Sequence, residues 1–226
     1  MITGDYIGAF AEGVRDGQGF LRWSNGDVYE GDFKNGLRHG RGTLKEFNGE
    51  MEYTGQFSMS QREGKGKQTW ANGDIYEGYW VKDKMEGEGE LKTKGGNYKG
   101  SFKNGLRDGP GVMSFKVGGH YEGNWSEGRM HGKGMYIWKD GRRYEGEWEK
   151  GERSGQGLMH FINGERYDGG FLNNKKHGSG WWRLTSGKVR PGEWRDDELV
   201  RWTGLEQFET QMKAARIKPK TKMLIV

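Results

Sequence analysis

A short motif of tyrosine, glycine and a second aromatic residue recurs along the chain at a nearly constant interval, and no other feature limits the fold as strongly. If each tyrosine is counted as position 0, glycine follows at position 2, phenylalanine or tryptophan at position 4, and glycine again at positions 11 and 13. The motif begins at Tyr6, Tyr29, Tyr53, Tyr76, Tyr98, Tyr121, Tyr144 and Tyr167, so that the intervals are 22 to 24 residues. A period this short predicts an array of small units that stabilise one another rather than a single globular core.

A ninth unit begins at Arg190 with the residues RPGEW. It keeps Gly192 and Trp194 but lacks the tyrosine, and we interpret it as a degenerate repeat. Pro191 has no backbone N–H, which suits the edge of a sheet. We therefore expect the strand around Gly192 to Trp194 to be the last strand of the sheet.

The composition agrees with a folded array only when the repeat is taken into account. With 43 glycines, 31% charged residues and a mean hydropathy of −1.04, the chain resembles a disordered protein, but ten Trp, ten Tyr and ten Phe contradict that interpretation. There is no cysteine, which excludes disulfides and thiolate chemistry. No stretch approaches the roughly 18 apolar residues of a membrane span, and the first ten residues lack the apolar core of a signal peptide. We expect a soluble protein of the cytoplasm.

The spacing within one unit predicts a β-hairpin with two different faces. Side chains alternate faces along a strand, so positions 0, 2 and 4 share one face, and so do positions 11, 13, 15 and 17. The first face is aromatic and the other is mostly polar, as Lys67 and Thr69 illustrate at positions 14 and 16. The expected register joins position 0 to 17, 2 to 15 and 4 to 13. On the polar face it places Glu30 opposite Lys45, Thr54 opposite Thr69 and Asp168 opposite Arg183.

That register also suggests why the motif needs glycine. A large ring at position 4 would lie opposite the glycine at position 13, where a side chain would collide with it. Between units, residues such as Ser24-Asn25-Gly26 predict a three-residue loop with a left-handed glycine in its last position, because a two-residue turn would move the next tyrosine to the wrong face.

Three segments carry a family resemblance: YEGDFKNGLRHGRGTL, YEGNWSEGRMHGKGMYIW and YEGEWEKGERSGQGLMHF resemble MORN repeats. The resemblance extends over residues 6–189. It implies an all-β fold, an elongated and twisted single-layer antiparallel sheet of stacked hairpins, and a role as a scaffold, often on cytoskeletal or ciliary structures. The chain departs from the family pattern where Ser60, Asp83 and Asn174 replace a loop glycine. Only His39, His131 and His177 keep the family's loop histidine.

The domain organisation is expected to have three parts: the repeat array over residues 1–202, a short amphipathic helix over 203–217 and a basic and apolar tail over 218–226. Thr203 to Glu206 fit a capping box, and Pro219 stops the helix. The helix carries one apolar stripe, formed by Leu205, Phe208, Met212 and Ala215. It either covers the open end or the aromatic face of this sheet, or docks on another protein.

The tail KPKTKMLIV resembles an attachment peptide for a partner protein or for an anionic membrane. The residues expected to make those contacts are Lys218, Lys220, Lys222, Met223, Leu224 and Ile225. Residues 203–226 carry a net charge of +3 out of the total of +5. The remaining 202 residues are therefore nearly neutral, which argues against nucleic acid as the partner.

Catalytic and metal chemistry find no support in the sequence. The three loop histidines are two to four repeats apart, about 19 Å or more, which is too far for one zinc ion. The Gly-x-Gly pairs lack the Lys-Ser or Lys-Thr of a phosphate-binding loop, and no nucleophile has an adjacent base. We expect no enzyme activity, no cofactor and no metal.

The expected function is that of a non-catalytic scaffold which binds an elongated protein partner, a helix or an extended peptide, on the aromatic face. Its setting would be a cytoskeletal, ciliary or flagellar assembly. Large rings concentrate in the middle and later units, and these are the expected contacts: Tyr76, Trp80, Tyr121, Trp125, Trp138, Tyr144 and Trp148. The alternative is a peripheral membrane adaptor that binds anionic phospholipid through the tail. The sequence leaves homo-oligomer formation open.

Overall fold

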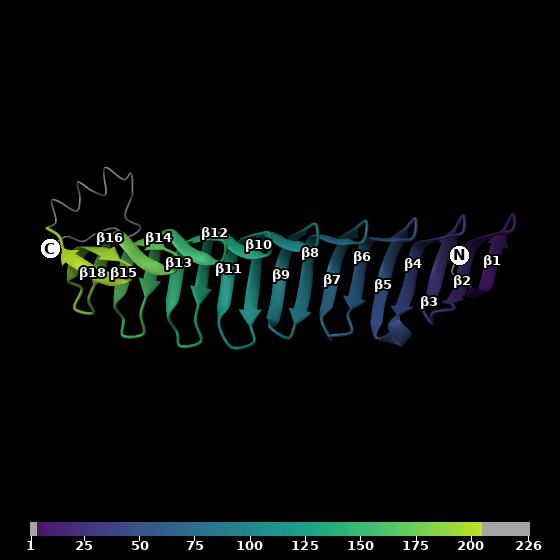
Figure 1. The fold of residues 1–226 in the computed structure, drawn as a ribbon, viewed down its shortest axis with the longest axis horizontal. Helices are drawn as coiled ribbons and strands as arrows, with labels where there is room; N and C mark the ends of the chain where they lie inside the picture. The colour runs from purple at the N-terminus through teal and green to yellow at the C-terminus, as the bar shows by residue number, and fades with distance from the viewer. Residues whose placement is uncertain (1–3, 205–226) are drawn as a thin grey trace. The chain divides into compact units, whose positions relative to one another are not determined.

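The computed structural model describes residues 4–204 and divides the chain into two compact units, unit 1 up to Lys116 and unit 2 from Val117 onward. Within each unit the strands follow one another in chain order as a single layer (Figure 1). The predicted class, an all-β antiparallel single layer of hairpins, is thereby confirmed in both units. The expected helix over 203–217 and the tail over 218–226 lie, apart from Thr203 and Gly204, outside the described residues.

Unit 1 contains ten strands, each antiparallel to the next. The strands are β1 Gly4–Ala11, β2 Val14–Trp23, β3 Val28–Lys34, β4 Leu37–Glu46, β5 Met51–Ser58, β6 Gln61–Thr69, β7 Ile75–Val81, β8 Lys84–Thr93, β9 Gly96–Lys103 and β10 Leu106–Phe115. A single turn of 3₁₀ helix, η1 Phe47–Gly49, joins β4 to β5 at the one interval of 24 residues.

Unit 2 contains eight strands in the same arrangement. They are β11 His120–Ser126, β12 Arg129–Ile137, β13 Arg143–Glu149, β14 Glu152–His160, β15 Arg166–Leu172, β16 Lys175–Arg183, β17 Val189–Arg195 and β18 Glu198–Trp202.

The expectation that the strand with Pro191 ends the sheet is wrong, because β18 pairs with β17 beyond it. In an antiparallel pair the N–H and C=O of one residue point to the same neighbour. The carbonyl of Pro191 accepts a hydrogen bond of 2.9 Å from the N–H of Thr203, on the β18 side. The missing N–H therefore removes one bond of the pair and does not prevent pairing.

The predicted hairpin register is also wrong, by two residues. Within a repeat, position 0 pairs with 15 and position 2 with 13, so that Glu30 lies opposite Thr43, Thr54 opposite Lys67 and Asp168 opposite Trp181. The hairpin tip is a two-residue turn, and a bulge next to it takes up two further residues. A shift by two residues keeps every side chain on its predicted face, so the aromatic face and the polar face are as expected.

Most loops between hairpins have the predicted three residues; the exceptions are the β4–β5 connection through η1 and the two-residue turn between Thr93 and Gly96. The N–H of Trp23 donates to the carbonyl of Asp27 and the N–H of Gly26 to the carbonyl of Trp23, both at 2.9 Å, which leaves a three-residue loop. Gly26 has a φ of 92°, the left-handed conformation that its place in the loop requires. The loops that end at Gly73, Gly141 and Gly164 have the same pair of hydrogen bonds.

Candidate partner-binding face

Each repeat builds the aromatic face around a tyrosine that lies over paired glycines. Gly31 on β3 pairs with Gly42 on β4 beneath Tyr29. A Cβ added to Gly42 would lie 2.5 Å from Cε2 of the Tyr29 ring, and one added to Gly31 would lie 2.7 Å from its hydroxyl and 2.4 Å from the Cα of Gly42. The hydroxyl of Tyr29 donates to the carbonyl of Asp32 at 2.9 Å. Tyr53 and Tyr98 make the same bond to the residue three positions on, at 3.0 Å. Glycine is thus required by the tyrosine of its own repeat, and not by the ring at position 4 as the predicted register implied.

The aromatic residue at position 4 connects one repeat to the next. Phe57 lies opposite Gly40 of the preceding repeat. The centroid of its ring is 5.2 Å from that of Tyr29 and 5.0 Å from that of Tyr53, and both contacts are edge-to-face. The rings of successive repeats therefore form an alternating edge-to-face series, which we call the aromatic ladder. Contacts of this geometry contribute about 0.5–1.5 kcal/mol each beyond the area that they bury.

The ladder is the core of each unit. The largest side chains with less than 2% exposure include seven ladder tyrosines, from Tyr29 to Tyr167. Burial raises the pKa of Tyr53 and of Tyr98 to about 12, and nearby Arg62 and Arg107 oppose that rise. These hydroxyls are therefore held neutral, as donors to backbone carbonyls.

A row of cations lies along the tip side of the ladder, at position 9 of most repeats. Arg62 lies over the ring of Trp80 at 4.4 Å, and Arg38 over Phe57 at 5.3 Å. Burial lowers the pKa of Arg38. The residues at position 9 are Arg15, Arg38, Arg62, Met85, Arg107, Met130, Arg153 and Lys176.

Hairpin tips hold these cations in place. Asp83, at the second residue of its tip, accepts hydrogen bonds from the N–H and the Nε of Arg62 in the preceding repeat, both at 3.0 Å. Ser60 and Asn174 likewise accept from the N–H of Arg38 and of Arg153. All three have a φ between 65° and 69°, and the side chain that replaces glycine joins neighbouring tips. The departures from the family pattern therefore add hydrogen bonds between neighbouring repeats.

In unit 2 one accessible part of the aromatic face is a group of half-buried rings next to cations, which we call the rim: Tyr136, Trp138, Phe161 and Trp182. Trp138 lies 4.7 Å from Tyr136, and the guanidinium groups of Arg142 and Arg153 lie 5.4 and 5.5 Å from its ring. Phe161 stacks on Trp182 with centroids 5.1 Å apart, and Lys176 lies over Trp182 at 4.9 Å. The rim offers flat apolar surface and positive charge together.

A family model matches eight consecutive segments of the chain: residues 6–28, 29–50, 53–75, 76–97, 98–120, 121–142, 144–166 and 167–189, each as a MORN repeat. The chain belongs to the MORN-repeat family. A search of curated proteins finds no match.

Solved structures resemble this MORN-repeat chain at low sequence identity. The TCP10 domain of Danio rerio CPAP is 12% identical, with a TM-score of 0.46, and the match covers 88% of this chain and 94% of that one. The TCP domain of Drosophila melanogaster SAS-4 (dCPAP), in complex with a proline-rich motif of Ana2 (dSTIL), is also 12% identical, with a TM-score of 0.34 and coverage of 85% and 90%.

The structure separates the seven rings named from the sequence into two groups. Tyr76, Tyr121 and Tyr144 have no exposed surface. Trp80, Trp125 and Trp148 are 2–5% exposed and belong to the ladder as well. Trp138 alone among the seven is half-buried and belongs to the rim.

The cations at position 9 and the rings that complete the rim were not predicted from the sequence. The recurrence of arginine or lysine at position 9 in six of eight MORN repeats was the available pattern. Its meaning depended on the bulge, which places position 9 opposite position 4 on the aromatic face. The tail residues from Lys218 to Ile225 lie outside the described residues.

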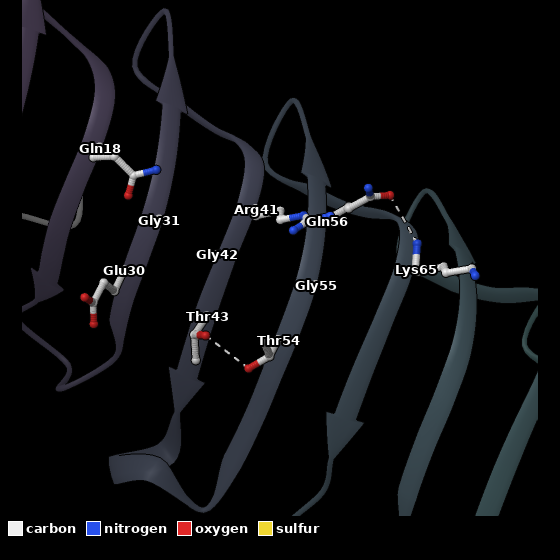
Figure 2. A pocket seen from close by; sticks show the side chains of 10 residues that line it. All are labelled: Gln18, Glu30, Gly31, Arg41, Gly42, Thr43, Thr54, Gly55, Gln56 and Lys65. Carbon is white, nitrogen blue, oxygen red and sulfur yellow. Dashed lines mark hydrogen bonds between the residues drawn. The ribbon is translucent and has the colours of Figure 1, made fainter.

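The polar face of unit 1 holds a second candidate, an open groove of about 720 Å³ (Figure 2). The hydroxyls of Thr43 and Thr54 are 3.0 Å apart, and the N–H of Lys65 donates to Oε1 of Gln56 at 3.2 Å. The groove is lined by Gln18, Glu30, Gly31, Arg41, Gly42, Thr43, Thr54, Gly55, Gln56 and Lys65. Its lining combines charges of both signs with bare glycine backbone, so it has no set of side chains that would select one class of ligand. The aromatic face is therefore the better candidate.

Within residues 4–204, no three His, Asp or Glu side chains are grouped so that they could hold a metal ion. No helix in that part of the chain has the length and apolar character needed to cross a membrane.

Proposed function

We propose that this MORN-repeat protein is a non-catalytic scaffold that binds an elongated protein partner across its aromatic face. The observation that carries the proposal is the rim of unit 2, where Trp138 and Trp182 remain half-buried beside Arg153 and Lys176. Tryptophan and arginine dominate the binding energy of protein interfaces. The partner that suits this surface is a helix or an extended peptide with apolar side chains flanked by carboxylates.

The seven rings named from the sequence have different roles in this proposal. Trp138 contacts the partner directly. The other six belong to the buried ladder, which stabilises the array beneath the rim, and Trp148 packs against Tyr136 at 6.1 Å. A cytoskeletal, ciliary or flagellar setting is part of the proposal and derives from the family.

The test begins with capture of partners by the full chain and their identification by mass spectrometry. The dissociation constant of each purified partner is then measured for Phe161→Ser and Trp182→Ser, and for Glu145→Lys on the opposite face as the control. We expect the two ring variants to weaken binding by at least about tenfold, or 1.4 kcal/mol, and the control to leave it unchanged. Equal affinity for ring variants that are folded would refute the proposal.

The membrane alternative is tested in the same preparation. We expect the full chain not to sediment with vesicles of anionic phospholipid beyond the amount seen with neutral vesicles. Sedimentation that is lost in a chain ending at Trp202 would instead assign the tail to lipid.

A further inference from the structure

The connections between hairpins differ in charge between the two units. Counted from position 16 of one repeat to the residue before position 0 of the next, the connections of unit 2 contain six Lys or Arg residues and two carboxylates, whereas those of unit 1 contain four and five. In unit 1 one of the cations, Lys45, is also paired with Glu52 at 3.3 Å. The loop side of unit 2 is therefore basic. The connections are residues 137–143, 160–166 and 183–189 in unit 2, and 22–28, 45–52, 69–75 and 92–97 in unit 1.

A row of basic side chains crosses four neighbouring strands on the loop side of unit 2. Arg143 on β13 pairs with His160 on β14, His160 with Arg166 on β15, and Arg166 with Arg183 on β16. Each of the four is next in the chain to a residue of the aromatic face, so their side chains lie on the polar face. We call them the basic row, which is about 14 Å long at a strand spacing of about 4.8 Å.

The charges of the basic row are only partly compensated. Oε2 of Glu145 lies 4.0 Å from Nη2 of Arg143, but none of the ion pairs within residues 4–204 involves Arg166 or Arg183. These two arginines lie directly opposite each other, and like charges in that position destabilise a sheet. Burial and the guanidinium groups of Arg143 and Arg166 lower the pKa of His160. A bound anion would relieve the repulsion within the row.

The carboxylates nearest to the row leave its loop side open. Asp140 and Glu165 accept hydrogen bonds from side chains of their own loops, at 2.8 and 3.0 Å. Glu145 and Asp168 lie on the same face as the row, two residues farther from the loops. They would repel a broad polyanion such as a nucleic acid or a membrane surface, whereas a single segment lying along the loop side of the row avoids them.

We infer that the basic row binds an acidic, extended segment of a partner protein, whose carboxylates pair with Arg143, Arg166 and Arg183. The guanidinium group binds a carboxylate through two parallel hydrogen bonds, which suits side chains fixed along a row. An extended segment of four or five residues, at about 3.3 Å each, is as long as the row. The basic row lies on the face opposite the rim, so this inference does not rest on the proposed function.

The test measures fluorescence anisotropy of a labelled peptide of six glutamates with the full chain at low ionic strength, where surface charges are least screened. Because the tail is also basic, the measurement is repeated in a chain in which Lys218, Lys220 and Lys222 are replaced by Gln. A peptide of six glutamines is the ligand control. Circular dichroism verifies that each variant is folded.

We expect Arg166→Gln with Arg183→Gln to weaken binding of the glutamate peptide at least about tenfold, because two of the three pairing groups are lost. Arg166→Lys with Arg183→Lys keeps the charge and should retain most of the binding. The matched control, Arg22→Gln with Lys45→Gln, changes the same row in unit 1 and should alter binding by less than about twofold. Lys176→Gln on the aromatic face should have as little effect.

Three results would overturn the inference. The first is a loss in the unit 1 control or in Lys176→Gln as large as that in the Arg166 and Arg183 variant. The second is binding that depends only on the tail lysines. The third is equally tight binding of a six-nucleotide single strand or of anionic phospholipid vesicles with the same dependence on Arg166 and Arg183, which would assign the row to polyanions in general.

Discussion

The aromatic face contains two kinds of ring that the sequence motif does not distinguish: the buried rings of the ladder and the half-buried rings of the rim. Ladder rings such as Tyr76 and Trp80 are 0–2% exposed and touch one another in an alternating series. Rim rings such as Trp138 are half-buried and lie beside cations. The regular recurrence of the motif marks the residues that hold the array together. The rings that remain accessible lie beside the motif, where repeats differ from one another.

The largest effect that separates ladder from rim is expected at alkaline pH. Burial raises the pKa of Tyr53 and Tyr98 to about 12, whereas tyrosine in an unfolded chain ionises near pH 10. The stability from these neutral rings is fully present below pH 10 and is lost as the pH rises toward 12, because only the unfolded chain can release its protons freely. We expect cooperative unfolding in that range, followed by circular dichroism together with tyrosinate absorbance.

The tyrosinate absorbance would also reveal the outcome that contradicts this prediction. If the buried tyrosines ionised near pH 10 while the protein stayed folded, the ladder would not be the closed core that we describe.

Removal of one ladder ring is expected to have the next largest effect. Tyr76→Ala leaves a cavity between Trp80 and Phe102 and uncovers Gly78 and Gly89. The free energy of unfolding should fall by about 3–5 kcal/mol in urea titrations. Tyr79→Ala is the control on the polar face of the same strand, since Tyr79 is 44% exposed, and it should change stability by no more than about 0.5 kcal/mol. A similar loss for both variants would remove the distinction between the faces.

Addition of one methyl group beneath the ladder tests the role of glycine. A Cβ at Gly89 would lie 2.5 Å from Cε2 of Tyr76, so Gly89→Ala must displace a packed ring. We expect a loss of about 1–3 kcal/mol. Gly95→Ala is the control, because its Cβ would meet only Oγ1 of Thr93, at 3.6 Å. If Gly89→Ala were neutral in urea titrations, the tyrosine would not require glycine beneath it.

The smallest effect is expected at the edge of the rim. Arg153→Met introduces methionine, which two other repeats have at position 9 as Met85 and Met130, so we expect the array to accommodate this side chain. The variant loses a cation over three rings and the hydrogen bond that Nη2 of Arg153 donates to the carbonyl of Asn174. We expect a loss of about 1–2 kcal/mol in thermal unfolding. A loss as large as that of Tyr76→Ala would place Arg153 in the core instead.

Much of the fold was predictable because alternation along a strand fixes the faces, and the loop glycines fix the three-residue connections. The register was not predictable from cross-strand pairs. Glu30 with Lys45 and Thr54 with Thr69 would be good cross-strand partners. The observed register, however, also provides favourable pairs, such as Thr43 with Thr54, whose hydroxyls form a hydrogen bond. The decisive features, a two-residue tip and a bulge, depend on backbone conformation at non-glycine residues such as Ser60, which composition does not reveal.

The candidate site was predictable in part for a related reason. The sequence located the aromatic face, but exposure depends on how rings cover one another across repeats. Tyr121 and Trp138 are both large aromatic residues in the sequence, and only the packing shows that the first is closed off and the second is half-buried. The last strand was missed because one proline was taken to end pairing, although only one of its two backbone groups is lost.

The most direct test of the division between ladder and rim measures stability and partner affinity on the same two variants. Trp138→Ala changes the rim, and Trp148→Phe changes the ladder, where it removes the bond from Nε1 to the carbonyl of Gly134. We predict that Trp138→Ala weakens binding of the identified partner by about 30-fold, or 2 kcal/mol, with the smaller loss of stability. Trp148→Phe should lower the unfolding free energy by about 1–2 kcal/mol and leave the dissociation constant unchanged. The opposite pattern, with binding lost in a folded Trp148→Phe and retained in Trp138→Ala, would contradict the account.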